Sequence, residues 1–321
     1  MKLESAYQVR MTDVNSGPID AVLAASGYES RASFVVSKTK FGSGTKKLVL
    51  GFADRHQIAR ETNDRKFKKL GFKIENADGA TGTDVKALLR TIVSESSSGS
   101  LSILIDYSSM TRTWYAAIIN FFKSEPLKLK RADIYFAYSL STYSRPHKPS
   151  PNAVMDPIPG FCQLHLPHRE TALVIGLGYE RDRALGLAEY IEARETYAFY
   201  ADPAIDSQFP RTVQENNREL LNRIGPNRVF SYPIADLKIT DSILSSLCKG
   251  LIGKFRVILA PLGPKPFSLL CLLLATRVDG LDVWRVSAGK QSSAIERSPS
   301  GRILVCKATF TNDADQATAS L

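Results

Sequence analysis

The chain has 321 residues, of which 44% are hydrophobic and 23% are charged, values that are typical of a folded protein and exclude wholesale disorder. No apolar run reaches the roughly 18 residues that a membrane span requires, and the start lacks the apolar segment of a secretion signal, so a cytoplasmic protein without membrane contact is expected. The net charge is +10, and residues 1–150 hold 23 Lys and Arg against 14 Asp and Glu, which indicates an anionic partner for the first half.

Strands alternate with helices along the first half of the chain. Strands are predicted over residues 20–26, 47–54, 72–76, 101–105 and 132–139. A polar helix precedes Gly71, a residue type that commonly ends helices, and further helices are predicted over 84–94 and 113–122. Alternation of this kind predicts a parallel sheet.

The second half repeats the first. Strands are predicted over 171–177, 196–202, 228–233, 256–260 and 281–288, with a polar helix before Gly225 and helices over 240–252 and 267–275. Both first strands run into Gly-Tyr-Glu followed closely by Arg-Ala, at residues 27–32 and 178–184, and both second strands end in aromatic-Ala-Asp. The repeat predicts an α/β protein of two tandem Rossmann-like parallel-sheet units related by internal duplication.

Proline marks the junction of the two units. Residues 145–160 contain five prolines, so we expect a first, basic unit over 1–144, a proline-rich linker with an edge strand over 145–168, and a second unit over 169–321. Two further apolar segments, 161–166 and 302–310, are expected to pair antiparallel with the fifth strand of the first and second unit, respectively.

Ligands of open α/β sheets bind at the carboxyl ends of the strands, so the polar residues there are the candidate ligand-binding residues. They are Tyr28, Glu29, Arg31, Asp54, Ser108, Ser109, Thr111 and Arg112 in the first half, and Tyr179, Glu180, Arg183, Asp202, Gly263 and Lys265 in the second. The loop 106–112 precedes a helix, so its N–H groups are suited to an anion and Arg112 to bidentate recognition of phosphate. The structural alternative is that Ser and Thr cap the helix, Asp106 orients the loop, and Glu29 pairs with Arg31.

The pattern Asp106-x-Ser108-x-x-x-Arg112 after the fourth strand resembles the strand-four signature of CRISPR-associated Rossmann fold (CARF) domains. In that family the loop helps to bind cyclic oligonucleotide second messengers, and two such units in one chain are similar to the SAVED domains of bacterial antiviral systems. The resemblance implies a nucleotide-binding sensor or effector in prokaryotic defence signalling, with a partner protein or oligomer as its output. The second half departs from the signature, since Ala260 replaces the Asp and Gly263-Pro264-Lys265 replaces the Ser-to-Arg stretch.

Two other functions use overlapping residues. The candidate catalytic residues of a nucleotide-processing enzyme are Glu29, Asp106 and Arg112. An N-glycosidase would use the two carboxylates beside an arginine, whereas a phosphodiesterase would use Arg112, Lys265 and Ser109. A nucleic-acid-binding module would use Lys66, Lys68, Lys69 and Lys73, which a solvated helical face explains equally well.

Several familiar motifs are incomplete or missing. The dinucleotide fingerprint lacks its third glycine at Arg181, no phosphate-binding P-loop occurs, and Pro167 prevents a helical pair of His165 and His168. We therefore expect neither a metal ion nor a resident cofactor.

Overall fold

A computed structural model describes residues 1–53, 57–96, 98–146, 151–166, 168–289 and 294–312. The chain forms two compact units. Unit 1 consists of two separate pieces of chain, Met1–Thr142 and Glu296–Leu321, whereas unit 2 is the continuous stretch Tyr143–Ile295. Within the described ranges, no helix has both the length and the apolar character needed to cross a membrane.

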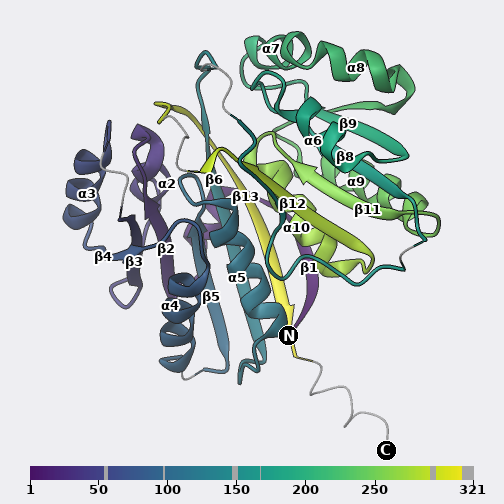
Figure 1. Cartoon of the computed structure of the whole chain (residues 1–321). Coiled ribbons are helices and arrows are strands. Elements are labelled where there is room, and N and C mark those ends of the chain that lie inside the picture. The colour runs from purple at the N-terminus through teal and green to yellow at the C-terminus, as the bar shows by residue number, and fades with distance from the viewer. Residues whose placement is uncertain (54–56, 97, 147–150, 167, 290–293, 313–321) are drawn as a thin grey trace, which may run out of the picture. The chain divides into compact units, whose positions relative to one another are not determined.

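Unit 1 is built on a seven-stranded sheet in the order β1-β13-β6-β5-β2-β3-β4 (Figure 1). The strands are β1 Lys2–Val9, β2 Ala21–Ser26, β3 Lys46–Phe52, β4 Lys73–Ala77, β5 Ser100–Asp106, β6 Arg131–Ser141 and β13 Pro299–Thr311. The five strands from β6 to β4 run parallel to one another, and β13 pairs antiparallel with β6 on one side and β1 on the other.

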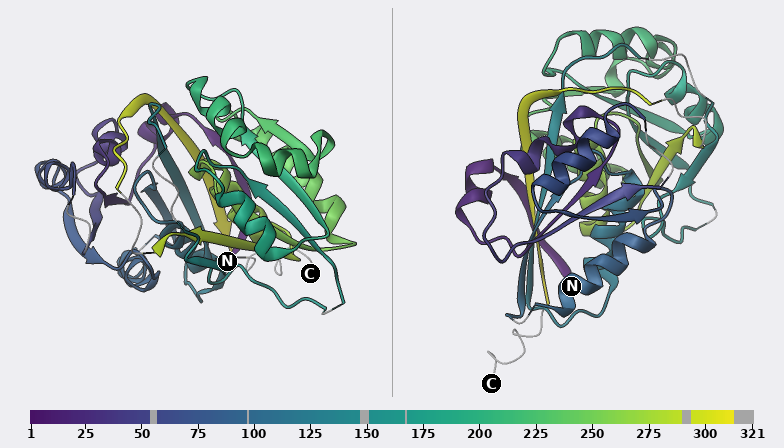
Figure 2. Two further views of the ribbon diagram at one scale, coloured as in Figure 1. Left: turned by 45° about the horizontal axis from the view of Figure 1, so that its top comes forward. Right: turned by 90° about the vertical axis from the view of Figure 1, so that its left-hand side faces the viewer.

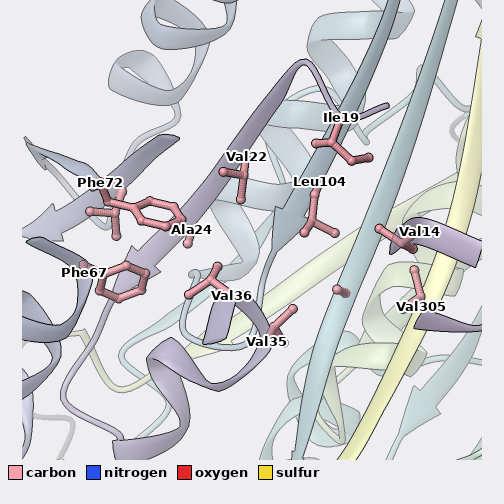
Figure 3. Close-up of a cluster of buried hydrophobic side chains, with 12 residues drawn as sticks. Val14, Ile19, Val22, Ala24, Val35, Val36, Phe67, Phe72, Leu104 and Val305 are labelled. Atoms are coloured by element: carbon pink, nitrogen blue, oxygen red, sulfur yellow. The ribbon is translucent and has the colours of Figure 1, made fainter. Parts of the chain in front are cut away.

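Helices cover both faces of this sheet. They are α1 Met11–Ser16, the short η1 Ser30–Ser33, α2 Phe34–Ser37, α3 Arg60–Lys69, α4 Thr83–Ser94 and α5 Arg112–Ser124. Figure 3 shows one buried layer, in which Val22 of β2 and Leu104 of β5 lie with Val35 of α2 and Phe67 of α3. Side chains alternate between the faces of a strand, so the neighbours of Leu104 point to the opposite face, where α4 packs against α5.

Unit 2 is built on a six-stranded sheet in the order β10-β9-β8-β11-β12-β7. Its strands are β7 Val154–Pro157, β8 Thr171–Gly176, β9 Glu195–Ala201, β10 Val229–Tyr232, β11 Arg256–Pro261 and β12 Leu281–Ser287. Its helices are α6 Arg183–Ile191, α7 Gln208–Asn216, α8 Arg218–Ile224, η2 Pro226–Arg228, α9 Leu237–Ile252 and α10 Lys265–Arg277. All neighbouring strands are parallel except β7, which pairs antiparallel with β12.

The two units share one order of parallel strands. Counted along the chain, the order is third-second-first-fourth-fifth in each, from β4 to β6 in unit 1 and from β10 to β12 in unit 2. This confirms the predicted α/β class with two tandem Rossmann-like sheets. It also fixes where the strand order reverses, between β2 and β5 and between β8 and β11, and ligands of such sheets bind beside that reversal.

The expected partners of the two extra apolar segments are wrong. The segment 302–310 does not extend the second sheet but lies within β13, in the first sheet between β6 and β1 (Figure 2). Residues 161–166 form no strand beside β6, and the N–H of Val283 in β12 donates to the Phe161 carbonyl. An apolar pattern shows that a segment is extended but not which edge it joins, and the 11-residue β6 matches β13 better than the seven-residue β12 does.

Candidate functional site

The loops that follow β2 and β5 lie side by side in unit 1. The two strands are neighbours in register, with Leu23 opposite Ile105. Gly27 comes so close to the second loop that a Cβ atom added to it would lie 2.8 Å from the Cβ atom of Ser109. The fold therefore brings together the candidate residues at 28–31 and at 106–112, while Asp54 lies outside the described residues.

Glu29 and Arg31 form the buried ion pair that was the structural alternative. The Nε atom of Arg31 lies 2.6 Å from Oε2 of Glu29, and its Nη1 donates to the Tyr138 hydroxyl and to the Ser139 carbonyl. The Arg31 side chain is 1% exposed. Burial by itself lowers the pKa of Arg31, but the nearby Tyr138 and Glu29 outweigh it and leave that pKa raised, so the guanidinium stays charged.

A second arginine completes the pairing of Glu29. The Nη1 atom of Arg297 donates to Oε1 of Glu29 at 2.8 Å, so each carboxylate oxygen accepts a hydrogen bond from a guanidinium. Arg297 precedes β13 and is 268 positions from Glu29. No local motif links residues so far apart, and sequence reasoning missed this contact.

The loop after β5 is shaped largely by its own polar side chains. Asp106 accepts from the N–H of Ser108, the Ser108 hydroxyl accepts from the N–H of Ser139, and Thr111 caps α5 by accepting from Trp114. These contacts assign orienting and capping roles to three residues of the loop.

Two residues of that loop are placed differently. Ser109 and Arg112 are partly exposed at the start of α5, and Arg112 is the first residue of that helix. The Ser109 hydroxyl oxygen is enclosed and has no hydrogen-bond partner among the described residues.

A buried asparagine holds the first loop in each unit, a feature that the sequence analysis did not find. In unit 1 the Nδ2 atom of Asn63 donates to the carbonyls of Gly27 and Glu29, at 2.9 and 2.8 Å. In unit 2 the side chain of Asn217 donates to the Gly178 carbonyl, and its neighbour Asn216 to the next carbonyl along. The repeated pairs Glu61-x-Asn63 and Glu215-x-Asn217 are the sequence signal that could have revealed it.

A further buried network closes the ends of β2 and β3. Arg60, which is 2% exposed, pairs with Asp64 at 2.9 Å and donates to the Phe52 carbonyl. Asp64 also accepts from the Ser26 hydroxyl. Gly51 is required beside this network, because a Cβ atom there would lie 2.7 Å from Nη2 of Arg60.

The equivalent loops of unit 2 meet through their backbones. The N–H of Gly263 donates to the Gly176 carbonyl at 2.8 Å, and a Cβ atom added to Gly263 would clash with the Leu177 carbonyl. A Cβ atom on Gly178 would lie 2.9 Å from the Leu262 carbonyl. Glycine is needed here for close approach, because the nearest atoms across the contact are backbone carbonyls.

The other candidates of unit 2 lie around this contact. Glu180 pairs with Arg183 at 3.2 Å, but their side chains are 35% and 16% exposed, unlike the buried pair of unit 1. The Tyr179 ring packs near Phe209, with centroids 5.8 Å apart. Asp202 directly follows β9, and Lys265 is the first residue of α10.

The basic residues of the proposed nucleic-acid face lie at the end of α3. Lys66, Lys68 and Lys69 occupy its last turn and are exposed, while Lys73 in β4 pairs with Glu75 at 2.6 Å. Cations in the last turn of a helix are stabilised by the helix dipole. This local effect explains the position of these lysines without a nucleic-acid ligand.

His165 is bound to a buried acid. Its Nε2 atom lies 3.0 Å from Oδ1 of Asp282, and Oδ2 of that fully buried residue accepts from Arg256. In the part of the chain that the structure describes, no group of three or more His, Cys, Asp and Glu residues is placed to hold a metal ion.

No protein-family model matches the chain, and no curated protein matches it in sequence. Its fold is therefore assigned from the two sheets themselves.

Proposed function

We propose that unit 1 binds a nucleotide or a cyclic-oligonucleotide-like anion at the carboxyl ends of β2 and β5. The observation that carries this proposal is the reversal of strand order between these two strands, directly beside the loop that opens α5. Unit 1 also holds most of the excess positive charge of the sequence.

The start of α5 offers the chemistry that a phosphate needs. The helix has 13 residues, so its dipole and first N–H groups favour an anion at its N-terminus. Arg112 stands at the first helical position, and its guanidinium suits a phosphate. The hydrogen bonds of Asp106 and Ser108 hold the loop in shape before any ligand arrives, which lowers the entropic cost of binding.

The pairing of the carboxylates favours binding over catalysis. A general acid must hold a proton and release it to the substrate. Both oxygens of Glu29 already accept from guanidinium groups, and one oxygen of Asp106 accepts from a backbone N–H, so these contacts would have to break before either carboxyl group served a substrate. An N-glycosidase built on these two residues is therefore the weaker hypothesis.

The signalling role rests on the resemblance to CARF and SAVED domains. The motif at 106–112 follows the fourth strand of a Rossmann-like unit, and two such units occur in the chain. We infer that ligand binding in unit 1 is read out by a partner protein or by oligomerisation, in a prokaryotic defence pathway.

The experiment is a thermal-shift screen of cyclic oligonucleotides and mononucleotides. A ligand present at about 100 times its Kd stabilises the protein by about 2.7 kcal/mol, a clear rise in melting temperature. Arg112→Ala should abolish this rise, whereas Arg65→Ala, which removes the same charge from exposed α3, should leave it intact. The proposal would be rejected if no compound in the panel stabilised the protein, or if Arg112→Ala bound as well as wild type. Formation of a product, detected by chromatography, would restore the hypothesis of a nucleotide-processing enzyme.

A further inference from the structure

A short segment of the chain lies across the first loop of the candidate site. Residues 296–298, here called the return segment, lead from unit 2 back into unit 1 and directly precede β13. The Ser30 hydroxyl donates to the Arg297 carbonyl at 3.4 Å, and the Arg297 side chain bonds Glu29. The return segment is thus attached to the loop through two consecutive residues, Glu29 and Ser30.

An acidic side chain of this segment already occupies a donor of the loop. Oε1 of Glu296 accepts from the N–H of Ser30 at 3.0 Å. Its other oxygen, Oε2, is enclosed and has no hydrogen-bond partner among the described residues. An enclosed carboxylate oxygen without a donor costs free energy, so Glu296 is an imperfect occupant of this position.

We propose that Glu296 is an internal ligand of an anion site at Ser30, and that the phosphate of a nucleotide displaces it. This deepens the proposed function, on which it rests, by naming what the ligand replaces. When the return segment leaves, the bond from Arg297 to Glu29 is lost as well, and Oε1 of Glu29 can then accept from a ribose hydroxyl. The site would therefore select a nucleotide over inorganic phosphate.

The start of β13 can absorb such a movement. Its register with β6 is irregular between Pro299 and Ile303, and Gly301 in this bulge has a φ of +88°. From Ile303 to Thr311 the pairing with β6 is regular. Release of the return segment breaks the bond from the Thr142 N–H to the Ser298 carbonyl and the pairing of Pro299 with Ser141, while β13 from Ile303 onward stays in place.

The test compares Glu296→Ala with wild type, using AMP as the probe and inorganic phosphate as the probe that lacks the ribose. Trypsin reports on the segment, since cleavage after Arg297 yields a fragment that begins at Ser298 and is identified by mass spectrometry. We expect Glu296→Ala to bind AMP about tenfold more tightly and to be cleaved at Arg297 faster without ligand. In wild type, AMP should accelerate that cleavage and phosphate should do so weakly.

Two further variants serve as controls. Glu61→Ala removes an exposed acid of α3 in the same unit and should behave as wild type in both assays. Glu296→Gln keeps the shape and an acceptor for Ser30, and should give intermediate values even if Glu296→Ala folds poorly.

The outcomes separate this inference from the function on which it rests. If AMP binds wild type without changing cleavage at Arg297, and Glu296→Ala neither binds more tightly nor is cleaved faster, the inference is overturned while the ligand-binding function stands. The inference also falls if AMP and phosphate bind neither protein. Tighter binding by Glu296→Ala that persists in Arg112→Ala supports the exchange at Ser30 and counts against the ligand position at α5.

Discussion

The loops at the two strand reversals occupy the same place in the two units and differ in what lies between them. In unit 1, Gly27 faces the side chain of Ser109. In unit 2, Gly178 and Gly263 face the carbonyl oxygens of Leu262 and Leu177. The close contact between the loops therefore involves a side chain in unit 1 and backbone carbonyls in unit 2.

The frame around the loops is nevertheless alike. Asn63 and Asn217 hold the loop carbonyls in both units, and both loops contain a Glu-Arg pair. The two units therefore share the groups that shape the first loop and differ in what lies beside it. Four experiments test this difference between the units.

The largest effect should come from separating the units. Residues 1–142 alone lack β13, which lies inside the first sheet between β6 and β1, so their backbone groups at that position are left without partners. We expect this fragment not to fold, as measured by circular dichroism, and residues 143–295 to fold alone. Joining 296–312 to the first fragment through a flexible linker should restore its structure, and a folded 1–142 fragment would contradict the prediction.

The two Glu-Arg pairs should respond unequally to loss of charge. Glu29→Gln leaves the buried Arg31 without its counter-ion and should lower the free energy of unfolding by about 3 kcal/mol. Glu180→Gln breaks a solvent-screened pair and should cost less than about 1 kcal/mol. Urea denaturation measures both, and equal losses would show that the burial difference has no energetic meaning.

The two glycines should differ in whether a second change rescues them. Gly27→Ala places a Cβ atom against Ser109 and should cost about 2 kcal/mol, most of which Ser109→Gly should return. Gly178→Ala places a Cβ atom against the carbonyl of Leu262. Leu262→Gly leaves that carbonyl in place and should therefore not restore the lost stability. Melting temperatures of the single and double variants decide this, and rescue in both units would remove the distinction.

The smallest effect concerns Asp133 of β6, whose side chain bonds two residues of β13. Burial alone would raise the pKa of Asp133, but hydrogen bonds from Thr309, Arg131 and Lys307 hold that pKa below its ordinary value. A lowered pKa contributes stability that is present near neutral pH and is lost as the pH falls through the folded-state pKa. Asp133→Asn should therefore be less stable than wild type by about 1 kcal/mol at pH 7, and thermal melts in acid should bring the two together.

Local patterns in the sequence predict much of this architecture. Alternating apolar strands and polar helices predicted both sheets and their parallel strands, because the periods of strand and helix are visible in any stretch of ten residues. The repeated Gly-Tyr-Glu located the first loop of each unit. The sequence did not reveal β1, in which Leu3 is the one core residue, because an exposed edge strand carries little apolar signal.

What the chain could not show by itself is which distant groups meet. The place of β13 beside β6 depends on hydrogen bonds and register between residues 158 to 180 positions apart, and the same apolar pattern would have suited β12. The Arg297 contact with Glu29 spans 268 positions, and the Ser30 contact with Glu296 spans 266. Local periodicity sets the kind of each element and the residues at its end, whereas tertiary packing decides the partners of those residues, because an ion pair or a strand pairing is defined only once both sides are in place.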